Sequence, residues 1–266
     1  MFLAIDIGNT NITLGLFKFN NNKIEDKPFQ IWRIATSKKK TADEYAIKIL
    51  DIFYYSKIDI SKEQIKAVAI ASVVPSLDNV FADLTKRYFK KDAMFITSKR
   101  AGGLKFLYSN PEEVGADRIA DAVAVYERYK TASIVIDFGT ATTFDCIDKD
   151  GSYLGGVITA GPLISAEALT QRTAKLPQVT LNMPAKIVGR TTVECIQSGL
   201  YYGDIGLVKE ILHRIKNEMV ADKIKIIATG GLSYLMVKEM EEIEGVIPEL
   251  TLEGIKIIWE KENIGA

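Results

Sequence analysis

The stretch L-A-I-D-I-G-N-T-N-I-T-L-G-L-F, from Leu3 to Phe17, decides how the rest of the chain is interpreted. The apolar residues on both sides of Asp6 predict a buried strand that carries one carboxylate. The small and polar residues Gly8 to Asn11 are typical of a turn. The alternation that continues through Leu16 then predicts a return strand, so the N-terminus is expected to form a hairpin.

The tip of this hairpin suits a phosphate group. Gly8 lets the backbone approach a ligand closely, and the neighbouring amides and hydroxyls are hydrogen-bond donors. The carboxylate of Asp6 can hold the water shell of a metal ion. An ordinary hairpin with a polar turn would show the same pattern, so this motif alone leaves both interpretations open.

A second copy of the pattern favours the phosphate interpretation. Ser133 to Asp148 reads S-I-V-I-D-F-G-T-A-T-T-F-D-C-I-D, in which Asp137-Phe138-Gly139 aligns on Asp6-Ile7-Gly8 without a gap. Each copy is a buried strand that runs into an aspartate and is followed by a threonine-bearing turn. Two such hairpins predict a duplicated architecture, with two phosphate-facing tips across a cleft.

Composition narrows the class of protein. With 266 residues, 47% of them hydrophobic and 26% charged, the chain is typical of a soluble globular protein. A formal net charge of zero predicts neither a nucleic-acid nor a membrane partner. No apolar run approaches the roughly 18 residues of a membrane span, and Asp6 and Asn9 interrupt what would be the apolar region of a signal peptide.

The cysteine and histidine counts bear on compartment and metals. Cys146 and Cys195 make no disulfide framework, which suits a reducing compartment, so a cytoplasmic location is expected. The single histidine, His213, lies beside an apolar helical stripe and is interpreted as a surface residue, so a hydrolase triad finds little support. Cys/His metal clusters are excluded by count, and any metal is expected on oxygen ligands.

The predicted elements describe an α/β protein. After the first hairpin, Phe29 to Ile34 is expected to be a third strand with Phe29 and Ile31 on one face. Thr41, with Glu44 three residues on, is typical of a helix start. The remaining expected elements of the first half are helix 41–55, strand 67–72, a helix from 76 and strand 93–96.

The second half is expected to repeat this order. Its predicted elements are helix 116–129 after a loop at 105–110, the second hairpin, strand 153–158, helix 163–172, one long or two shorter helices over 191–219 with possible breaks at Gly199 and Gly203, strand 224–228, a helix from 233 and a last helix over 253–262. The sequence therefore predicts two closely coupled domains, 1–114 and 115–266, and the last helix is placed so that it can pack back on the first domain.

Gly115-Ala116-Asp117-Arg118 opens the helix over 116–129. An acid at a helix start is often only a capping or dipole-stabilising residue. Beside a nucleotide, however, Asp117 could accept a proton from an attacking hydroxyl, while Arg118 holds an anionic substrate. Phosphoryl transfer needs positioning, charge neutralisation and an oriented nucleophile, and these residues fit that need. The turn at Thr229-Gly230-Gly231 could approach a ligand or be only a strand-to-helix connection.

Taken together, the motifs resemble those of type III pantothenate kinases. They are D-I-G-N-T, G-A-D-R, D-F-G-T-A-T-T, G-G-V-I, S-A-E-A-L with Q-R-T-A-K-L-P, and T-G-G, and they occur in the order of that family from Asp6 to Gly231. The resemblance implies the acetate and sugar kinase/Hsp70/actin fold, with two ribonuclease H-like (actin-like ATPase) halves around a central nucleotide cleft. It also implies ATP-dependent phosphorylation of pantothenate to 4'-phosphopantothenate, the first step of coenzyme A biosynthesis.

The resemblance carries residue roles for the ATP side of the site. It places Asp137 on a monovalent cation, K⁺ or NH₄⁺, and Thr140 on ATP. Asp6 would organise Mg²⁺ through water. The first phosphate loop would comprise Asp6, Ile7, Gly8, Asn9, Thr10, Asn11, Ile12 and Thr13.

The resemblance also carries roles for the acceptor side. It makes Asp117 the general base, with Gly115, Ala116 and Arg118 lining the pantothenate site. Tyr108 and Thr192 stand where the family has further pantothenate contacts. In this family the site is completed across a homodimer interface, so a homodimer is expected.

One departure and two alternatives accompany the resemblance. The family commonly has proline-glycine after the G-G-x-I strand, whereas this chain has Thr159-Ala160-Gly161-Pro162, which bears on the shape of that loop. A sugar or other small-molecule kinase of the same fold would keep both hairpins, and a nucleotide-binding regulator would bind without turnover. The joint presence of Asp6, Asp117, Arg118 and Asp137 disfavours the regulator.

Overall fold

The computed structural model describes residues 1–20, 23–60 and 64–263. The chain divides into two compact units, which are interleaved along the sequence. Unit 1 comprises Met1–Leu104, Ser109–Ala124 and Leu250–Ala266, and unit 2 comprises Lys105–Tyr108 and Val125–Glu249. The sequence predicts two continuous domains with one boundary after residue 114, and this boundary stays a prediction. Among the described residues, none of the helices has the length and apolar character needed to cross a membrane.

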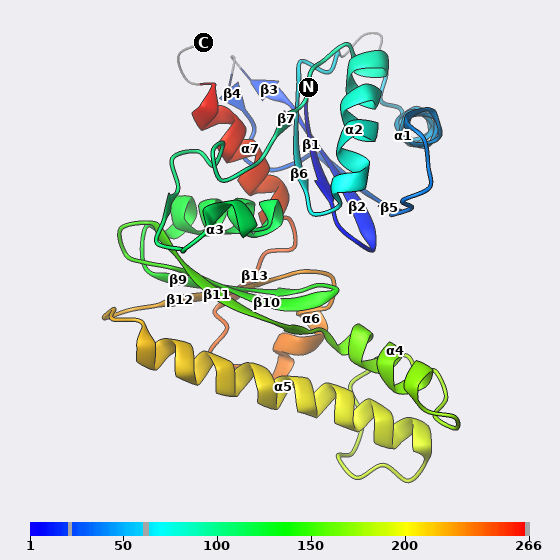
Figure 1. The fold of residues 1–266 in the computed structure, drawn as a ribbon, viewed down its shortest axis with the longest axis vertical. Helices are drawn as coiled ribbons and strands as arrows, with labels where there is room; N and C mark the ends of the chain where they lie inside the picture. Colours follow the sequence, from blue (N-terminus) through cyan, green and yellow to red (C-terminus); the bar gives the residue numbers. More distant parts are fainter. Residues whose placement is uncertain (21–22, 61–63, 264–266) are drawn as a thin grey trace. The chain divides into compact units, whose positions relative to one another are not determined.

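Unit 1 contains a five-stranded sheet of order β5-β2-β1-β6-β7 (Figure 1). β1 pairs antiparallel with β2, as the N-terminal hairpin motif predicts, and parallel with β6. β5 pairs antiparallel with the other edge of β2. The strands are β1 (Phe2–Ile7), β2 (Asn11–Phe17), β5 (Gln30–Ala35), β6 (Ala67–Ser72) and β7 (Met94–Phe95), and a separate two-stranded sheet joins β3 (Phe19–Asn20) and β4 (Lys23–Ile24).

Two helices cover one face of this sheet, α1 (Ala42–Tyr55) and α2 (Pro75–Leu84). The second of them, α2, continues into the π-helical turn η1 (Thr85–Phe89). Alternate residues of β1 and β2 join the apolar faces of both helices in one buried cluster. The predicted capping box at the start of α1 is present: the Glu44 amide donates to Thr41 Oγ1 over 3.3 Å, and the Thr41 amide donates to Glu44 Oε2 over 2.8 Å. The helix therefore begins where the sequence predicts.

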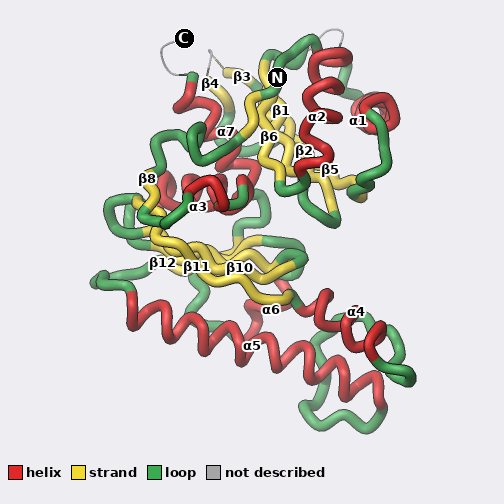
Figure 2. The backbone as a smooth tube through the Cα atoms, viewed as in Figure 1, coloured by secondary structure: helices red, strands yellow, loops and turns green. Residues whose placement is uncertain are grey.

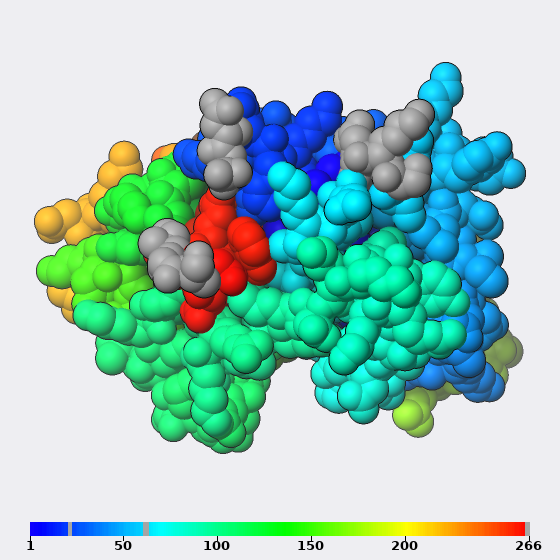
Figure 3. Space-filling view, turned by 90° about the horizontal axis from the view of Figure 1, so that it is seen from above, coloured from blue at the N-terminus to red at the C-terminus, as the bar shows by residue number. Residues whose placement is uncertain are grey.

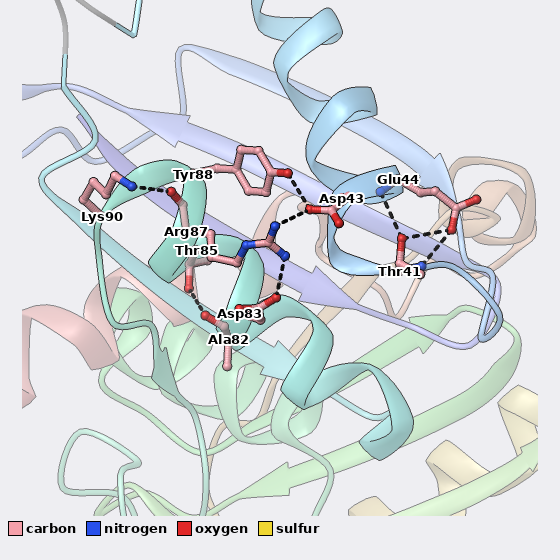
Figure 4. A network of polar contacts seen from close by, with 9 residues as sticks. All are labelled: Thr41, Asp43, Glu44, Ala82, Asp83, Thr85, Arg87, Tyr88 and Lys90. Carbon is pink, nitrogen blue, oxygen red and sulfur yellow. Dashed lines mark hydrogen bonds and ion pairs between the residues drawn. The ribbon is translucent and has the colours of Figure 1, made fainter.

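Side chains on α1, α2 and η1 also form a polar network (Figure 4). Asp43 Oδ1 of α1 lies 2.9 Å from Arg87 Nη2, and Arg87 Nη1 lies 3.0 Å from Asp83 Oδ2. The Tyr88 hydroxyl donates to the same Asp43 oxygen over 2.5 Å. These groups are about half exposed, so we interpret the network as a contact that links α1 to α2 and η1 and contributes modestly to stability.

The opposite face of the sheet in unit 1 carries α7 (Leu250–Glu262), which packs on β1 and β6. Phe2 and Trp259 place their ring centroids 5.2 Å apart, and a Cβ at Gly15 would lie 2.8 Å from the Leu252 side chain. The C-terminal end of α7 reaches the surface, where it is the red patch in the space-filling view (Figure 3). The last helix thus belongs to the same unit as the first hairpin.

Unit 2 contains a six-stranded sheet of order β13-β12-β9-β10-β11-β8 (Figure 2). The second predicted hairpin is β9 with β10, and β12 joins β9 in parallel. The strands are β8 (Lys105–Phe106), β9 (Ser133–Phe138), β10 (Ala141–Ile147), β11 (Ser152–Ala160), β12 (Lys225–Thr229) and β13 (Gly245–Val246).

The long helix α5 (Thr192–Glu218) runs along one face of this sheet (Figure 1). Its apolar side and alternate residues of β9, β10 and β12 form the buried cluster of the unit. Cys146 belongs to this cluster, whereas His213 is exposed, as expected. Glycines do not break α5, because Gly199 and Gly203 lie on an exposed side of an unbroken helix. The other helical segments are η2 (Pro111–Glu113), α3 (Ala116–Tyr129), α4 (Pro162–Arg172), α6 (Ser233–Met236) and η3 (Val237–Glu239).

Two details differ from the sequence-based expectation. On β5 the buried face carries Trp32 and Ile34, whereas Ile31 is 36% exposed, so the expected face of this strand was wrong. The reason is register, because Ile34 pairs with the buried Ile12 of β2. The expected loop at 105–110 also begins with the short strand β8, which joins β11 in parallel.

Candidate active site

The first hairpin forms a tight backbone turn at its tip. The Gly8 amide donates to the carbonyl of Asn11 over 3.0 Å, and a Cβ at Gly8 would lie 3.0 Å from that oxygen, so glycine fits this close approach. Thr36 braces the tip from β5: its hydroxyl donates to the Gly8 carbonyl over 2.6 Å and its amide to the Thr10 carbonyl over 3.0 Å. Asn9 and Thr10, at the tip of this turn, are exposed.

Asp6 lies on β1 opposite Thr13 of β2 and beside Ala71 of β6. Its side chain is half-buried, one residue before the buried Ile7. Since successive side chains of a strand alternate between faces, Asp6 shares the α7 face of the sheet with Phe2, while Ile7 joins the core beneath α1 and α2. The carboxylate of Asp6 thus lies near the C-terminal end of β1, in an otherwise apolar strand.

The start of α3 lies beside this end of β1. The Val73 amide donates to the Ile7 carbonyl over 3.0 Å, and a Cβ at Gly115 would lie 3.4 Å from Val73 Cγ1. The same Cβ would lie 2.5 Å from Asp117 Oδ1, so glycine at 115 leaves the room that this carboxylate occupies. Unit 1 therefore brings Gly115 and Asp117 of the G-A-D-R motif close to the end of the first hairpin strand.

Asp117 has the electrostatics of a base. Burial raises the pKa of its carboxyl, an effect opposed by the Arg118 amide, which donates to Asp117 Oδ1 over 2.7 Å, and by the positive charge of Arg118. The side chain is nevertheless partly accessible to solvent. A carboxyl whose pKa is raised by burial has a higher affinity for a proton, and this property suits a general base.

The second hairpin holds its aspartate between two glycines. A Cβ at Gly139 would lie 3.3 Å from Asp137 Oδ2, and one at Gly230 would lie 2.1 Å from Asp137 Oδ1. Gly230 has a φ of +89°, which glycine adopts without strain. The turn after β12, which could have been a plain connection, thus packs its backbone against the carboxylate of β9. Sequence reasoning singled out this turn without linking it to Asp137.

The loop that departs from the family pattern forms the start of α4. Gly161 is the residue before the helix, and Pro162 is its first residue, a position at which proline is favourable because its fixed φ suits a helix start. A Cβ at Gly161 would lie 2.5 Å from the Thr140 carbonyl, so the loop packs directly on the tip of the second hairpin. The displaced proline is therefore accommodated locally, and Thr140 stays exposed.

Two further expected substrate residues, Tyr108 and Thr192, lie in unit 2. Tyr108 follows β8 and is half-buried, with its ring packed on the backbone of Gly155 of β11. Thr192 is the exposed first residue of α5, after the capping residue Thr191. Tyr108 is thus built into the sheet of unit 2, whereas Thr192 lies at an open helix end.

The carboxylates of the two hairpins fit metal ions bound chiefly by a ligand's own oxygens. Among the described residues, no group of three or more His, Cys, Asp or Glu side chains forms a metal-binding cluster. Mg²⁺ in kinases is usually held by one or two carboxylates together with waters and substrate phosphates, and Asp6 is placed at a strand end for that role. Asp137 offers a carboxylate against which the backbone packs closely at Gly139 and Gly230.

The fold defines the class of protein. It is similar to that of a candidate 2-dehydro-3-deoxygalactonokinase from Sinorhizobium meliloti, with a TM-score of 0.62, 12% identity and 99% of each chain covered. A candidate Baf family transcriptional activator from Campylobacter jejuni has a TM-score of 0.58 at 18% identity and covers 99% of this chain and 100% of its own. The chain is thus an α/β protein of the sugar kinase and actin-like ATPase fold, as predicted.

Sequence comparison identifies the family within this class. Residues 2–214 match the family described as type III pantothenate kinase. The type III pantothenate kinase of Endomicrobium trichonymphae is 54% identical over 98% of this chain and 99% of its own. That of Geobacter sulfurreducens is 46% identical over 99% of this chain and 100% of its own. The chain belongs to the type III pantothenate kinase family, a family of phosphotransferases, which confirms the resemblance drawn from the motifs.

Proposed function

We propose that this chain transfers the γ-phosphate of ATP to a hydroxyl of pantothenate, giving ADP and 4'-phosphopantothenate, with Asp117 as the general base. The observation that carries the proposal is the environment of Asp117, a partly buried carboxyl of raised pKa in the first turn of α3, beside the end of the first hairpin strand. Family membership supports both the substrate and the reaction, since relatives that match almost the whole chain carry that name.

The reaction needs one proton transfer from the acceptor. Asp117 takes the proton of the pantothenate hydroxyl. At the same time, the oxygen of that hydroxyl forms a bond to the γ-phosphorus, and the bond from the γ-phosphorus to the ADP oxygen breaks. Arg118 stands next to the base and provides a cation for the carboxylate of pantothenate. Gly115 and Ala116 leave room around the carboxylate of Asp117, because neither has a long side chain.

The two hairpins provide the phosphate contacts. The braced tip at residues 8–11 presents amides and hydroxyls to the nucleotide, and Thr140 provides a further hydroxyl from the second hairpin. Mg²⁺, held through water by Asp6, would neutralise charge on the transferring phosphate when bound. Asp137 would take a monovalent cation, because its carboxylate lies among backbone atoms with no second acid close by in sequence.

We further propose that the active form is a homodimer. Unit 2 exposes an unusual number of large apolar side chains along α4, the following loop and the start of α5. These are Leu163, Ile164, Leu169, Met183, Ile187, Val188 and Val193, which we call the unit 2 apolar surface. Thr192 lies within this surface. In the proposed dimer, a second copy binds to this surface, and Thr192 of the first chain then lies next to the pantothenate site of the second.

The first test is ADP release by the purified protein with Mg-ATP and K⁺, with and without pantothenate. Pantothenate-dependent ADP release is the expected result. ADP release with a panel of sugars, and none with pantothenate, would instead favour the alternative small-molecule kinase. ATP binding without turnover on any acceptor would favour the nucleotide-binding regulator.

The cation role has its own test. We expect activity to require K⁺ or NH₄⁺, because a cation bound by oxygen ligands is matched to its site by size and charge. Replacing K⁺ by Na⁺ at constant ionic strength should remove most of the turnover, and Asp137→Asn should weaken the response to K⁺. Full activity in Na⁺ alone would contradict the assignment of Asp137.

A further inference from the structure

The segment that carries Tyr108 is anchored to one residue of β11, Tyr153. β8 pairs with β11 in parallel, so Phe106 lies beside Tyr153, and the Leu107 amide donates to the Tyr153 carbonyl over 2.9 Å. The rings of Phe106 and Tyr108 both meet the Tyr153 ring at steep angles, with centroid distances of 5.9 and 6.1 Å. Tyr153 is fully buried between them.

The hydroxyl of Tyr153 is fixed in turn by a buried acid. It donates to Asp145 Oδ1 over 2.7 Å, and Asp145 is fully buried on β10. Thr143, two residues earlier on the same strand, donates to Asp145 Oδ2 over 3.4 Å. This buried hydrogen bond restricts the orientation of the phenol ring of Tyr153.

These residues share the face of the unit 2 sheet that carries the cation candidate. Thr143 pairs with Asp137 across β9 and β10, and Asp145 follows Thr143 on the same side because side chains alternate along a strand. On the next strand, Gly156 lies directly opposite Asp145, so no side chain competes for the space there. The result is a connected row of side chains from Asp137 to Tyr108, carried entirely by unit 2.

We propose that Asp145 and Tyr153 are positioning residues that set the orientation of Tyr108 for the acceptor substrate. This proposal rests on the proposed function and on the family resemblance, which places Tyr108 among the pantothenate contacts. The ring of Tyr108 packs against the ring of Tyr153, and Asp145 holds the Tyr153 ring in place by accepting a hydrogen bond from its hydroxyl. Gly155 contributes by leaving room, since a Cβ there would lie 3.2 Å from Tyr108 Cδ2. Asp145 and Tyr153 are both fully buried, so both would act through Tyr108.

The test compares Tyr153→Phe and Asp145→Leu with the wild-type protein in steady-state kinetics. Tyr153→Phe removes one hydroxyl and keeps the ring, so we expect the KM for pantothenate to rise about tenfold, with kcat and the KM for ATP nearly unchanged. Asp145→Leu should raise the same KM at least as much. Asp145→Asn keeps an acceptor oxygen for the phenol and should largely restore the wild-type KM.

A matched control separates positioning from general loss of stability. Tyr201 is another fully buried tyrosine of unit 2, whose hydroxyl donates over 3.4 Å to the Leu235 carbonyl. Tyr201→Phe should leave the KM for pantothenate unchanged, and thermal melting should show all variants folded at the assay temperature. If Asp145→Leu melts below that temperature, Tyr153→Phe and Asp145→Asn still carry the test.

The outcomes distinguish the two proposals. If wild-type protein shows no pantothenate-dependent turnover, the proposed function fails, whatever the variants do. If the wild type turns over pantothenate but Tyr153→Phe has an unchanged KM, or loses kcat and both KM values together with Tyr201→Phe, the positioning role is wrong. A rise in the KM for pantothenate alone, reversed in Asp145→Asn, supports it.

Discussion

At the scale of single residues, the proposed mechanism depends on Asp117 as the general base. Asp117→Asn keeps the size and most of the hydrogen bonding of the side chain but removes its basicity. We expect kcat to fall by about 10²–10⁴-fold, the usual contribution of a general base, with ATP affinity retained. Steady-state turnover and calorimetric titration with ATP check the two parts separately. Activity close to wild type in this variant would contradict the assignment of the base.

Asp204 is a buried acid that bears on stability rather than on the proposed chemistry. It lies in the middle of α5, 7% exposed, and its Oδ2 has no hydrogen-bond partner among the residues that the structure describes. Burial raises the pKa of this carboxyl from 3.8 to about 6. Because the folded-state pKa lies above the unfolded value, the folded protein binds this proton more tightly, and stability is lost as pH rises from about 3.8 through about 6.

Asp204→Asn should therefore stabilise the protein above neutral pH. The shift corresponds to at most about 3 kcal/mol, and partial solvation reduces the expected gain to about half of that. Denaturant unfolding at pH 5 and pH 8 measures it, and the gain should be larger at pH 8. Asp222→Asn, at an exposed aspartate outside the helices, is the control. An equal gain from both variants would show that net charge, rather than burial of Asp204, is responsible.

At the scale of elements, the sequence was informative wherever local rules decide. Both hairpins follow from strand alternation around a polar turn, and α1 begins at its capping box because Thr41 and Glu44 satisfy the first free amides locally. The face of β5 was wrong because register is set by the partner strand, which lies elsewhere in the sequence. Gly199 and Gly203 were possible breaks, but packing of the opposite side of α5 keeps the helix continuous.

The candidate site was predictable only in part for the same reason. Asp6, Asp117 and Asp137 each stand in a short motif whose residue types indicate chemistry. The link between Asp137 and Gly230 joins residues far apart in the chain, and so does the link between Tyr153 and Tyr108. Asp145 could have been noticed as a charge within an otherwise apolar strand, but its partner hydroxyl comes from β11 and is fixed only by strand pairing.

The crossing of α7 and α3 in unit 1 gives a prediction about an element contact. A Cβ at Gly254 would lie 2.0 Å from the Ala120 carbonyl oxygen, so the two helices meet backbone to backbone. Gly254→Ala should destabilise the protein by about 1–3 kcal/mol, because the clash outweighs the better helix propensity of alanine. Gly206→Ala on α5 is the matched control, since open space surrounds that position. A higher melting temperature for Gly254→Ala than for wild type would show that α7 can move away from α3.

At the scale of the whole molecule, the open question is how one chain completes its pantothenate site. Asp117 and Arg118 open α3, whereas Thr192 begins α5 on the unit 2 apolar surface. If Thr192 serves the site of a second copy, a variant of one residue can be complemented by a variant of the other. Sedimentation of the wild-type protein should first show a dimer at micromolar concentration, because a monomer rarely exposes so much apolar surface.

Subunit mixing then tests whether the site is shared. Asp117→Asn and Thr192→Arg should each be nearly inactive alone, the first for lack of a base and the second because a bulky cation fills the acceptor position. In a heterodimer, one site receives both defects and the other receives neither. Equal mixing after mild dissociation makes about half of the dimers heterodimers, so activity should recover to about a quarter of wild type. Mixing Asp117→Asn with Arg118→Ala is the control, because both defects lie on α3 and every site keeps one of them. Two outcomes would contradict the shared site: recovery of activity in the control mixture, or no recovery in the first mixture although the dimers exchange freely. Either would show that the site of each chain does not use Thr192 of its partner.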